Sequence, residues 1–296
     1  MIQIDRMIID DAGGNPEKLA FSVIKQIVDL SPPVPVREIA EAVDIYEIRE
    51  DALIGFEGGL ITTQDKSEGA ILVRGDRPEA RKRFTISHEL GHYLNPWHTA
   101  KRADGFRCRA KDMAVVRFQV GDRAMQMEVE ANQFAAELLM PTSFITSFIH
   151  RLAGIDIEHI LLVAEKFEVS REAAARRYVE AHDEFAAVIF SKDGVIRYAK
   201  KHKSFPPLCV RKDDLLPELC ISKRSSLPVG RVSDWCDVDG DIWLRDAKGR
   251  HIVEQTLAQH NGFRMTLISV SEDESNDDEQ ETDWNPPSFH RPRRRP

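Results

Sequence analysis

The segment RKRFTISHELGHYLNP, residues 81–96, contains the pattern His-Glu-x-x-His. On an α-helix, residues four apart lie about 40° apart around the axis and roughly 6 Å apart along it, so both imidazoles can reach one ion. Zinc accepts nitrogen ligands at about 2.0 to 2.1 Å, which fits this arrangement. The segment therefore predicts a helix that stops before Pro96 and carries two zinc ligands, His88 and His92.

The sides of this predicted helix differ in character. Four residues form an apolar stripe nearly opposite the two histidines: Ile86, Leu90, Tyr93 and Leu94. Glu89 lies about 100° round from His88, so we expect it to reach a water on the metal as general base rather than to be a ligand. Gly91 would let another element come close. The alternative is a pair of surface histidines, although a chance match to the pattern is expected in only a few per cent of such chains, roughly.

A catalytic zinc usually has a third protein ligand, and two candidates compete for this position. His98 follows His92 by six residues, the spacing of a longer three-histidine pattern. That pattern has glycine at the position where this chain has Asn95. Asparagine tolerates the left-handed conformation that the turn requires, so His98 remains a candidate.

The second candidate lies in MEVEANQFAAELLMP, residues 127–141, within a helix predicted over residues 122–140. Glu128 falls in the apolar sector of this helix, and an inward carboxylate needs a partner, which a metal ion supplies. Glu130 is predicted to be a solvated carboxylate on the polar face. Asn132 can be an outer hydrogen-bonding group or a plain polar helix residue.

At this point the chain resembles a known family. RKRFTISHELGH followed by EVEANQFAAELLMP resembles the ImmA/IrrE-type zinc metallopeptidases, and PVPVREIA is similar to their amino-terminal region, so the resemblance covers roughly residues 15–182. It implies a zincin-like fold whose third zinc ligand is a glutamate of the later helix, here Glu128. It also implies a protein substrate, namely a helix-turn-helix transcriptional repressor.

The expected chemistry is zinc-dependent hydrolysis of a peptide bond. Two imidazoles and one carboxylate leave Zn²⁺ with net positive charge, so it can lower the pKa of a bound water toward about 7. Glu89 would accept the water's proton and pass it to the departing amine. We expect the substrate to lie along an edge strand around residues 52–73, because strand addition satisfies its backbone groups.

The pattern around these two helices predicts an α+β domain over residues 1–183. Helices are predicted over residues 16–30 and 36–45, followed by short strands of a small antiparallel sheet over residues 52–56, 59–63 and 69–73. A loop is predicted over residues 98–121, and further helices over residues 143–182.

After about Glu184 the pattern changes to that of strands. FAAVIFSKDGVIRYAK predicts two strands joined at residues 192–194, and a late helix is predicted near residues 252–260. We expect a second, smaller α/β module over residues 184–271, which either forms only a small core or regulates the peptidase. Residues 272–296, acidic and then rich in arginine and proline, predict a disordered tail.

Composition narrows the function classes further. The 296 residues are 42% hydrophobic and 30% charged, as in a globular protein, and no apolar run reaches the roughly 18 residues that span a bilayer. With no signal peptide at the start, we expect a cytoplasmic protein with no membrane partner. The cysteines form no C-x-x-C pair and are predicted to be free, mostly structural thiols: Cys108, Cys209, Cys220 and Cys236.

The rival interpretation is a DNA-binding regulator with a structural zinc. Residues 156–182 can be read as a helix-turn-helix that presents Arg171, Arg176 and Arg177 to phosphate. However, the turn lacks glycine, and the net charge of -8 opposes general attraction to nucleic acid. We therefore expect ordinary helix packing here and no direct nucleic-acid binding.

Overall fold

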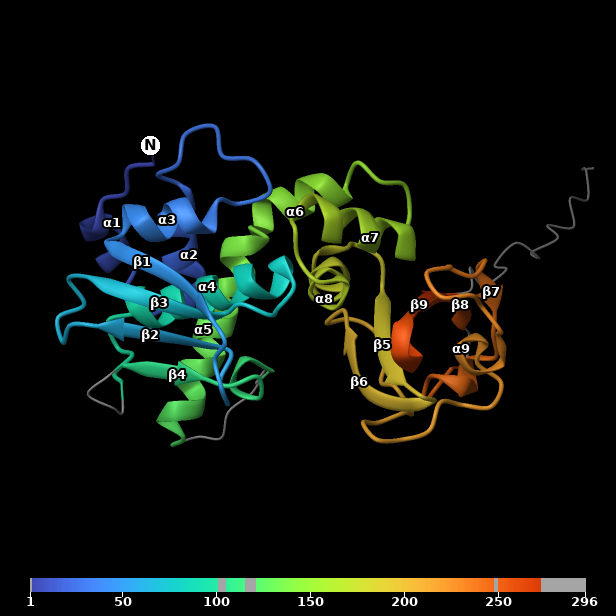
Figure 1. Ribbon diagram of the computed structural model, residues 1–296. Coiled ribbons are helices and arrows are strands. Elements are labelled where there is room, and N and C mark those ends of the chain that lie inside the picture. The colour runs from blue at the N-terminus through green and yellow to red at the C-terminus, as the bar shows by residue number, and fades with distance from the viewer. Residues whose placement is uncertain (1, 101–104, 115–120, 248–249, 273–296) are drawn as a thin grey trace, which may run out of the picture.

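The computed structural model describes residues 2–100, 105–114, 121–247 and 250–272, which form a mixed α+β fold with two sheets (Figure 1). The helices are α1 (Arg6–Asp10), α2 (Pro16–Ile24), α3 (Val36–Ala42), α4 (Glu79–Leu94), α5 (Arg123–Leu139), α6 (Thr142–Ile149), α7 (Ile157–Lys166), α8 (Arg171–Ala181) and α9 (Ile221–Arg224). The strands are β1 (Ile45–Asp51), β2 (Gly58–Thr62), β3 (Gly69–Arg74), β4 (Phe106–Cys108), β5 (Ala186–Lys192), β6 (Val195–Lys201), β7 (Cys236–Asp237), β8 (Arg250–Ala258) and β9 (Phe263–Glu272).

The first sheet has the strand order β1-β3-β2-β4. It is mixed rather than antiparallel as predicted, because β1 pairs with β3 in parallel while the other pairs are antiparallel. The strand predicted at residues 52–56 is also wrong, since β1 ends before that segment. As an edge strand, β1 has mainly exposed side chains and therefore lacks the alternation that identifies a half-buried strand. The predicted loop over residues 98–121 contains β4.

Helices α4 and α5 pack against each other behind this sheet, close to their predicted bounds (Figure 1). Gly91 allows the close approach, because a Cβ on it would lie 3.1 Å from the Cα of Ala131. The expectation that Gly91 admits another element is thus confirmed. The end of α4 is capped by Lys66, whose Nζ donates to the carbonyl oxygens of His92 and Asn95 at 2.7 Å each.

Helices α6, α7 and α8 lie between the two sheets (Figure 1). The second sheet has the order β6-β5-β9-β8-β7, and all of its pairs are antiparallel. The predicted hairpin of β5 and β6 is present, but the helix predicted near residues 252–260 is wrong, since β8 occupies that segment. Most of β8 is buried, including the polar residues Glu254, Gln255 and Thr256, so its sequence shows no alternation of polar and apolar residues.

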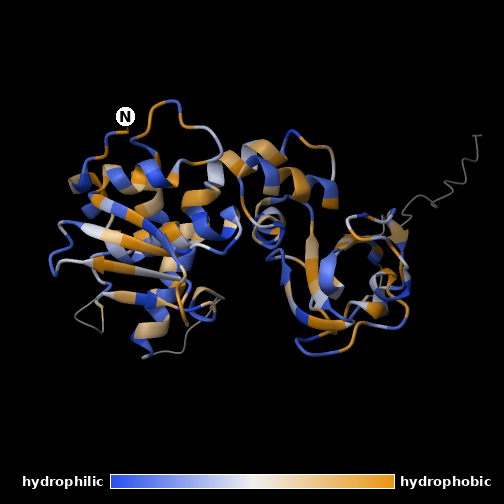
Figure 2. Ribbon diagram, in the orientation of Figure 1, coloured by the Kyte–Doolittle hydropathy of each residue, from blue (hydrophilic) through white to orange (hydrophobic). Residues whose placement is uncertain are grey.

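Strand β5 connects two hydrophobic cores. It is apolar along most of its length (Figure 2), and its side chains point alternately to the two faces of the sheet. Val188 and Phe190 join the large core, which also contains residues of α2 to α8. Ala187 and Ile189 join a smaller core around the fully buried Trp243.

The boundary predicted at Glu184 falls between α8 and β5, and the large core continues across it. The division into units of residues 1–183 and 184–271 stays a prediction. The predicted tail of residues 272–296 lies, from residue 273 on, outside the described residues. No helix in the described part of the chain is both long and apolar enough to cross a membrane.

Candidate metal centre

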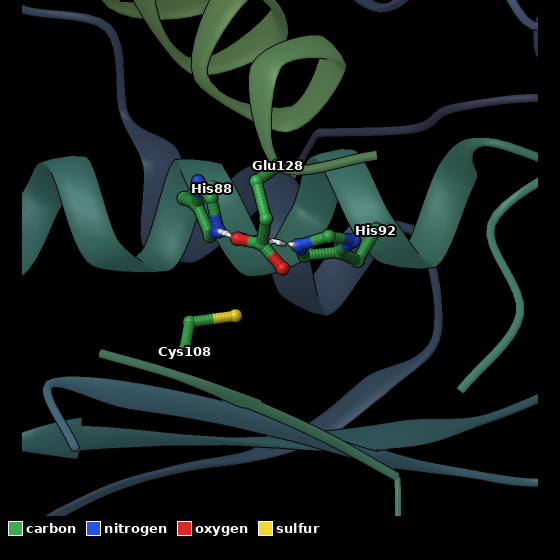
Figure 3. Close-up of side chains that lie close together, drawn as sticks. All are labelled: His88, His92, Cys108 and Glu128. Carbon is green, nitrogen blue, oxygen red and sulfur yellow. Dashed lines mark hydrogen bonds and ion pairs between the residues drawn. The ribbon is translucent and has the colours of Figure 1, made fainter. Parts of the chain in front are cut away.

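Three predicted ligands converge from two helices, His88 and His92 from α4 and Glu128 from α5 (Figure 3). The Nε2 atoms of the two histidines are 3.2 Å apart. Glu128 Oε2 lies 3.3 Å from the first of these atoms and 3.7 Å from the second. Ligand bonds of about 2.0 to 2.1 Å around a tetrahedral zinc require donor atoms about 3.3 Å apart. The triangle therefore has the dimensions of three edges of a zinc coordination tetrahedron.

The hydrogen bond of His88 indicates which ring nitrogen can bind a metal. Its Nδ1 lies 2.9 Å from the amide oxygen of Asn132, which can only accept. Nδ1 therefore carries the proton, and Nε2 offers its lone pair to the centre of the triangle. Asn132 thus acts as the outer hydrogen-bonding group, one of the two roles left open by the sequence.

His92 is oriented by a longer chain of hydrogen bonds. His98 Nε2 lies 2.8 Å from a carboxylate oxygen of Glu130 and donates to it, which leaves His98 Nδ1 as an acceptor. His92 Nδ1 lies 3.0 Å from that atom and donates to it, so His92 Nε2 also keeps its lone pair for the centre.

This chain of hydrogen bonds revises two expectations. Both ring nitrogens of His98 are engaged away from the triangle, so the structure places His98 behind His92 and Glu128 in the triangle. The prediction that Glu130 is solvated is wrong, because its side chain is only 17% exposed and binds His98. The partner of Glu130 lies in a loop distant in sequence, which the helical face pattern cannot reveal.

The protonation states of the ring nitrogens suit a cation site. Burial lowers the pKa of His92 to about 4 and that of His98 to about 2, so both rings are neutral at pH 7. With the protons of His88 and His92 on Nδ1, their two Nε2 atoms and the carboxylate of Glu128 form a donor set that fits Zn²⁺.

Glu89 is fully buried beside the triangle and is not part of it. Among the residues described, its carboxylate oxygens accept from no nitrogen or oxygen donor, and the thiol of Cys108 lies close enough to donate to them. Burial raises the pKa of Glu89 well above its usual value, and the charge of Glu128 raises it further. Gly58 of β2 lies directly over this carboxylate, since a Cβ there would come within 2.8 Å of Glu89 Oε1.

One residue of the cluster was not predicted. Cys108 of β4 contributes its sulfur to the same group, in which the ligand atoms of all four residues lie within 4.8 Å of one another (Figure 3). The sequence predicts a structural thiol at this position, because no motif spacing distinguishes this cysteine. Only the strand alternation of β4, which is too short to be recognised in the sequence, brings it to the site.

A cleft of about 880 Å³ opens beside Glu128. Residues from β4, from α5 and from the loop before β2 line it, including Phe106, Arg107, Met125 and Ile54. The expected substrate edge at residues 52–73 is wrong, since β2 and β3 are interior strands and β1 and β4 are the edges. Of these two edges, β4 is the one that borders the cleft.

Two of the three arginines of the predicted helix-turn-helix have intramolecular partners, while Arg171 at the start of α8 is exposed. Arg177 binds Glu137 and the carbonyl oxygen of Met140, and Arg176 lies 5.0 Å from the centre of the Tyr198 ring. These contacts hold α8 against α5 and β6. The arrangement agrees with helix packing rather than with a surface presented to phosphate.

Comparison with known proteins gives two findings. Residues 55–178 match the family model of the IrrE N-terminal-like domain, peptidase family M78. Among solved structures the chain is similar to a Mycobacterium tuberculosis transcriptional regulator, with 12% sequence identity and a TM-score of 0.54, over 89% of this chain and 77% of that one. At this identity the likeness shows the fold alone. A comparison with curated proteins gives no match.

Proposed function

Because residues 55–178 of this chain belong to the IrrE N-terminal-like family of peptidases, the ImmA/IrrE family, we propose that the protein is a zinc-dependent endopeptidase. The observation that carries the proposal is the triangle of His88, His92 and Glu128, with the buried carboxylate of Glu89 beside it. These four residues supply a zincin-like donor set and a proton acceptor within one buried site.

Each protein group has a definite task in this proposal. Zinc held by His88, His92 and Glu128 would supply a Lewis acid that lowers the pKa of water and polarises the scissile carbonyl. Glu89 takes the proton of the attacking water and delivers it to the leaving amine. Its desolvated carboxylate has a raised pKa, which makes it a stronger base, while a nearby cation would lower that pKa again.

The substrate in this proposal is an extended protein segment in the cleft beside β4. Strand addition along the outer edge of β4, which pairs with no strand among the described residues, would satisfy the backbone groups of the segment and bring its carbonyls past Glu128. The exposed apolar side chains of Ile54 and Met125 at this cleft would contact substrate side chains. A single ordered strand, rather than a folded domain, fits a cleft of about 880 Å³.

The substrate class follows from the family resemblance. We propose that the substrate is a helix-turn-helix repressor, whose cleavage relieves repression. The similar structure from Mycobacterium tuberculosis is named a transcriptional regulator, which agrees with a role in transcription.

The test is cleavage of repressors encoded near this protein by wild type and by the Glu89→Gln variant. We expect Glu89→Gln to bind zinc as wild type does and to cleave about 10²- to 10⁴-fold more slowly, because only the proton acceptor is removed. Gln133→Ala, which changes an exposed residue of α5, is the control and should cleave normally. Full activity of Glu89→Gln would contradict the proposal.

A second candidate function is a DNA-binding regulator with a structural zinc, which the name of the similar structure favours. The engaged side chains of Arg176 and Arg177 oppose it. Salt-sensitive binding to duplex DNA that survives a His88→Ala substitution would support this candidate over the peptidase.

A further inference from the structure

Strand β4 places Cys108 against the candidate metal centre. Phe106 and Cys108 are buried while Arg107 between them points outward, as expected for successive residues of a strand. The Phe106 ring stacks on the His92 ring with centroids 4.5 Å apart. The same face of β4 therefore holds one metal ligand in place and directs a thiol to the others.

The register of β4 with β2 gives the thiol access to the site. Cys108 pairs with Gly58, the residue that leaves room for the Glu89 carboxylate. That carboxylate is fully buried, and in the part of the chain that the structure describes it has no partner besides the weak thiol donor of Cys108 itself. The Nε2 lone pairs of His88 and His92 also point at each other. The buried carboxylate and these lone pairs together indicate that the space between α4, α5 and β4 is suited to a cation.

The dimensions of the four-residue group suit a closed site. Bonds of about 2.0 Å to nitrogen or oxygen and 2.3 Å to sulfur put a thiolate about 3.5 Å from the other donor atoms of a tetrahedral zinc. All four ligand atoms lie within 4.8 Å, so the sulfur needs to move by roughly 1 Å to complete the tetrahedron. Four protein ligands are typical of structural zinc, whereas catalytic zinc keeps one position open.

We infer that Cys108 is a fourth protein ligand that closes the metal centre in the resting protein and thereby keeps the peptidase latent. The inference rests on the proposed function and adds its regulation. Opening is an exchange of ligands: the thiolate leaves the metal and takes up a proton from solvent, and a water takes the vacated position, so no oxidant or reductant is needed.

Strand β4 is suited to move during this exchange. It has three residues, lies at the edge of its sheet and borders the cleft. A substrate segment that pairs with its outer edge would displace the same three residues that carry Cys108. Substrate binding and opening of the metal position are therefore coupled, which limits cleavage to segments that engage β4.

X-ray absorption of the zinc-loaded full chain tests the ligand directly. We expect one sulfur neighbour at about 2.3 Å in wild type, besides nitrogen and oxygen at about 2.0 Å. The sulfur should disappear in Cys108→Ser and remain in Cys220→Ala, which removes another buried thiol outside the cluster. In the cobalt-substituted protein, a sulfur-to-cobalt charge-transfer band should follow the same pattern.

Cleavage of the repressor tests latency separately. If the thiolate occupies the fourth position in about nine-tenths of molecules, Cys108→Ser should cleave roughly tenfold faster than wild type, and Cys220→Ala should not change the rate. Zinc without a sulfur neighbour in wild type, or a sulfur neighbour that persists in Cys108→Ser, overturns the inference and leaves the proposed function intact. An unchanged or lower rate in Cys108→Ser overturns latency. A wild-type protein that binds no metal overturns both proposals.

Discussion

The chain of hydrogen bonds from Glu130 through His98 to His92 makes a quantitative prediction about zinc affinity. In Glu130→Ala, the buried Nε2–H of His98 loses a charged acceptor at 2.8 Å, a bond worth about 1.5 to 3 kcal/mol. The tautomer of His98 with its proton on Nδ1 then becomes more favourable, because Nε2 no longer has a charged acceptor. Nδ1 of His98 would donate to Nδ1 of His92, so the proton of His92 moves to Nε2. Zinc binding must reverse this tautomer, so we expect its Kd to rise about 10- to 100-fold.

A competition titration of zinc against a chromogenic chelator measures this Kd. Glu130→Gln should show a smaller rise, because its amide oxygen can still accept from His98. The matched control is Gln133→Ala on the same helix, whose side chain is exposed. Affinity equal to that of the control would refute the role of this hydrogen-bond chain, and complete loss of zinc would indicate that Glu130 is itself a ligand.

Three further predictions concern the scaffold. Gly91→Ala places a Cβ 3.1 Å from the Cα of Ala131, and overpacking of about 1 to 3 kcal/mol should outweigh the gain of about 1 kcal/mol in helix propensity, so urea denaturation should show a net loss of about 1 kcal/mol. Because the pKa is about 4 for His92 and about 2 for His98, the unfolded chain binds protons below pH 6.5 that the folded one does not. The free energy of unfolding of the metal-free protein should therefore fall as pH falls from 6.5 toward 4, by up to about 1.4 kcal/mol per pH unit for each of the two histidines. A free energy of unfolding that rises in this range would be contrary to this reasoning. Glu254→Ala removes the acceptor of the buried indole N–H of Trp243 and of the backbone N–H of Ile221. The free energy of unfolding should therefore fall by about 2 to 4 kcal/mol, while zinc affinity stays unchanged.

The three candidate ligands could be picked out from the sequence because their spacing is local. His88 and His92 are one helical turn apart, and the position of Glu128 within its own helix places it on an inward face. Each inference needs only the helical period and the cost of an unpaired buried charge. The structure brings these three residues together as expected from their helices.

The residues that the sequence analysis misjudged depend on contacts between distant segments. The partner of Glu130 is 32 positions away in a loop, and Cys108 reaches the site through a strand of three residues. Neither arrangement leaves a periodic pattern in the chain. Sheet order is equally non-local, which is why the edge that borders the cleft could not be identified beforehand.

The incorrect helix at β8 has a different origin. Its segment contains polar residues such as Glu254 and Gln255 that are typical of helices, and both are buried in the sheet. Glu254 accepts from Trp243, and Gln255 accepts from the backbone N–H of Ile157. Tertiary hydrogen bonds therefore override the local preference, and only the folded chain reveals them.

The measurement that tests the central claim most directly is zinc binding by Glu128→Ala beside wild type and His98→Ala. Joint coordination by α4 and α5 predicts one zinc per wild-type chain, a Kd raised more than about 100-fold in Glu128→Ala, and a smaller rise in His98→Ala. Wild-type affinity in Glu128→Ala, with zinc lost from His98→Ala, would contradict the account.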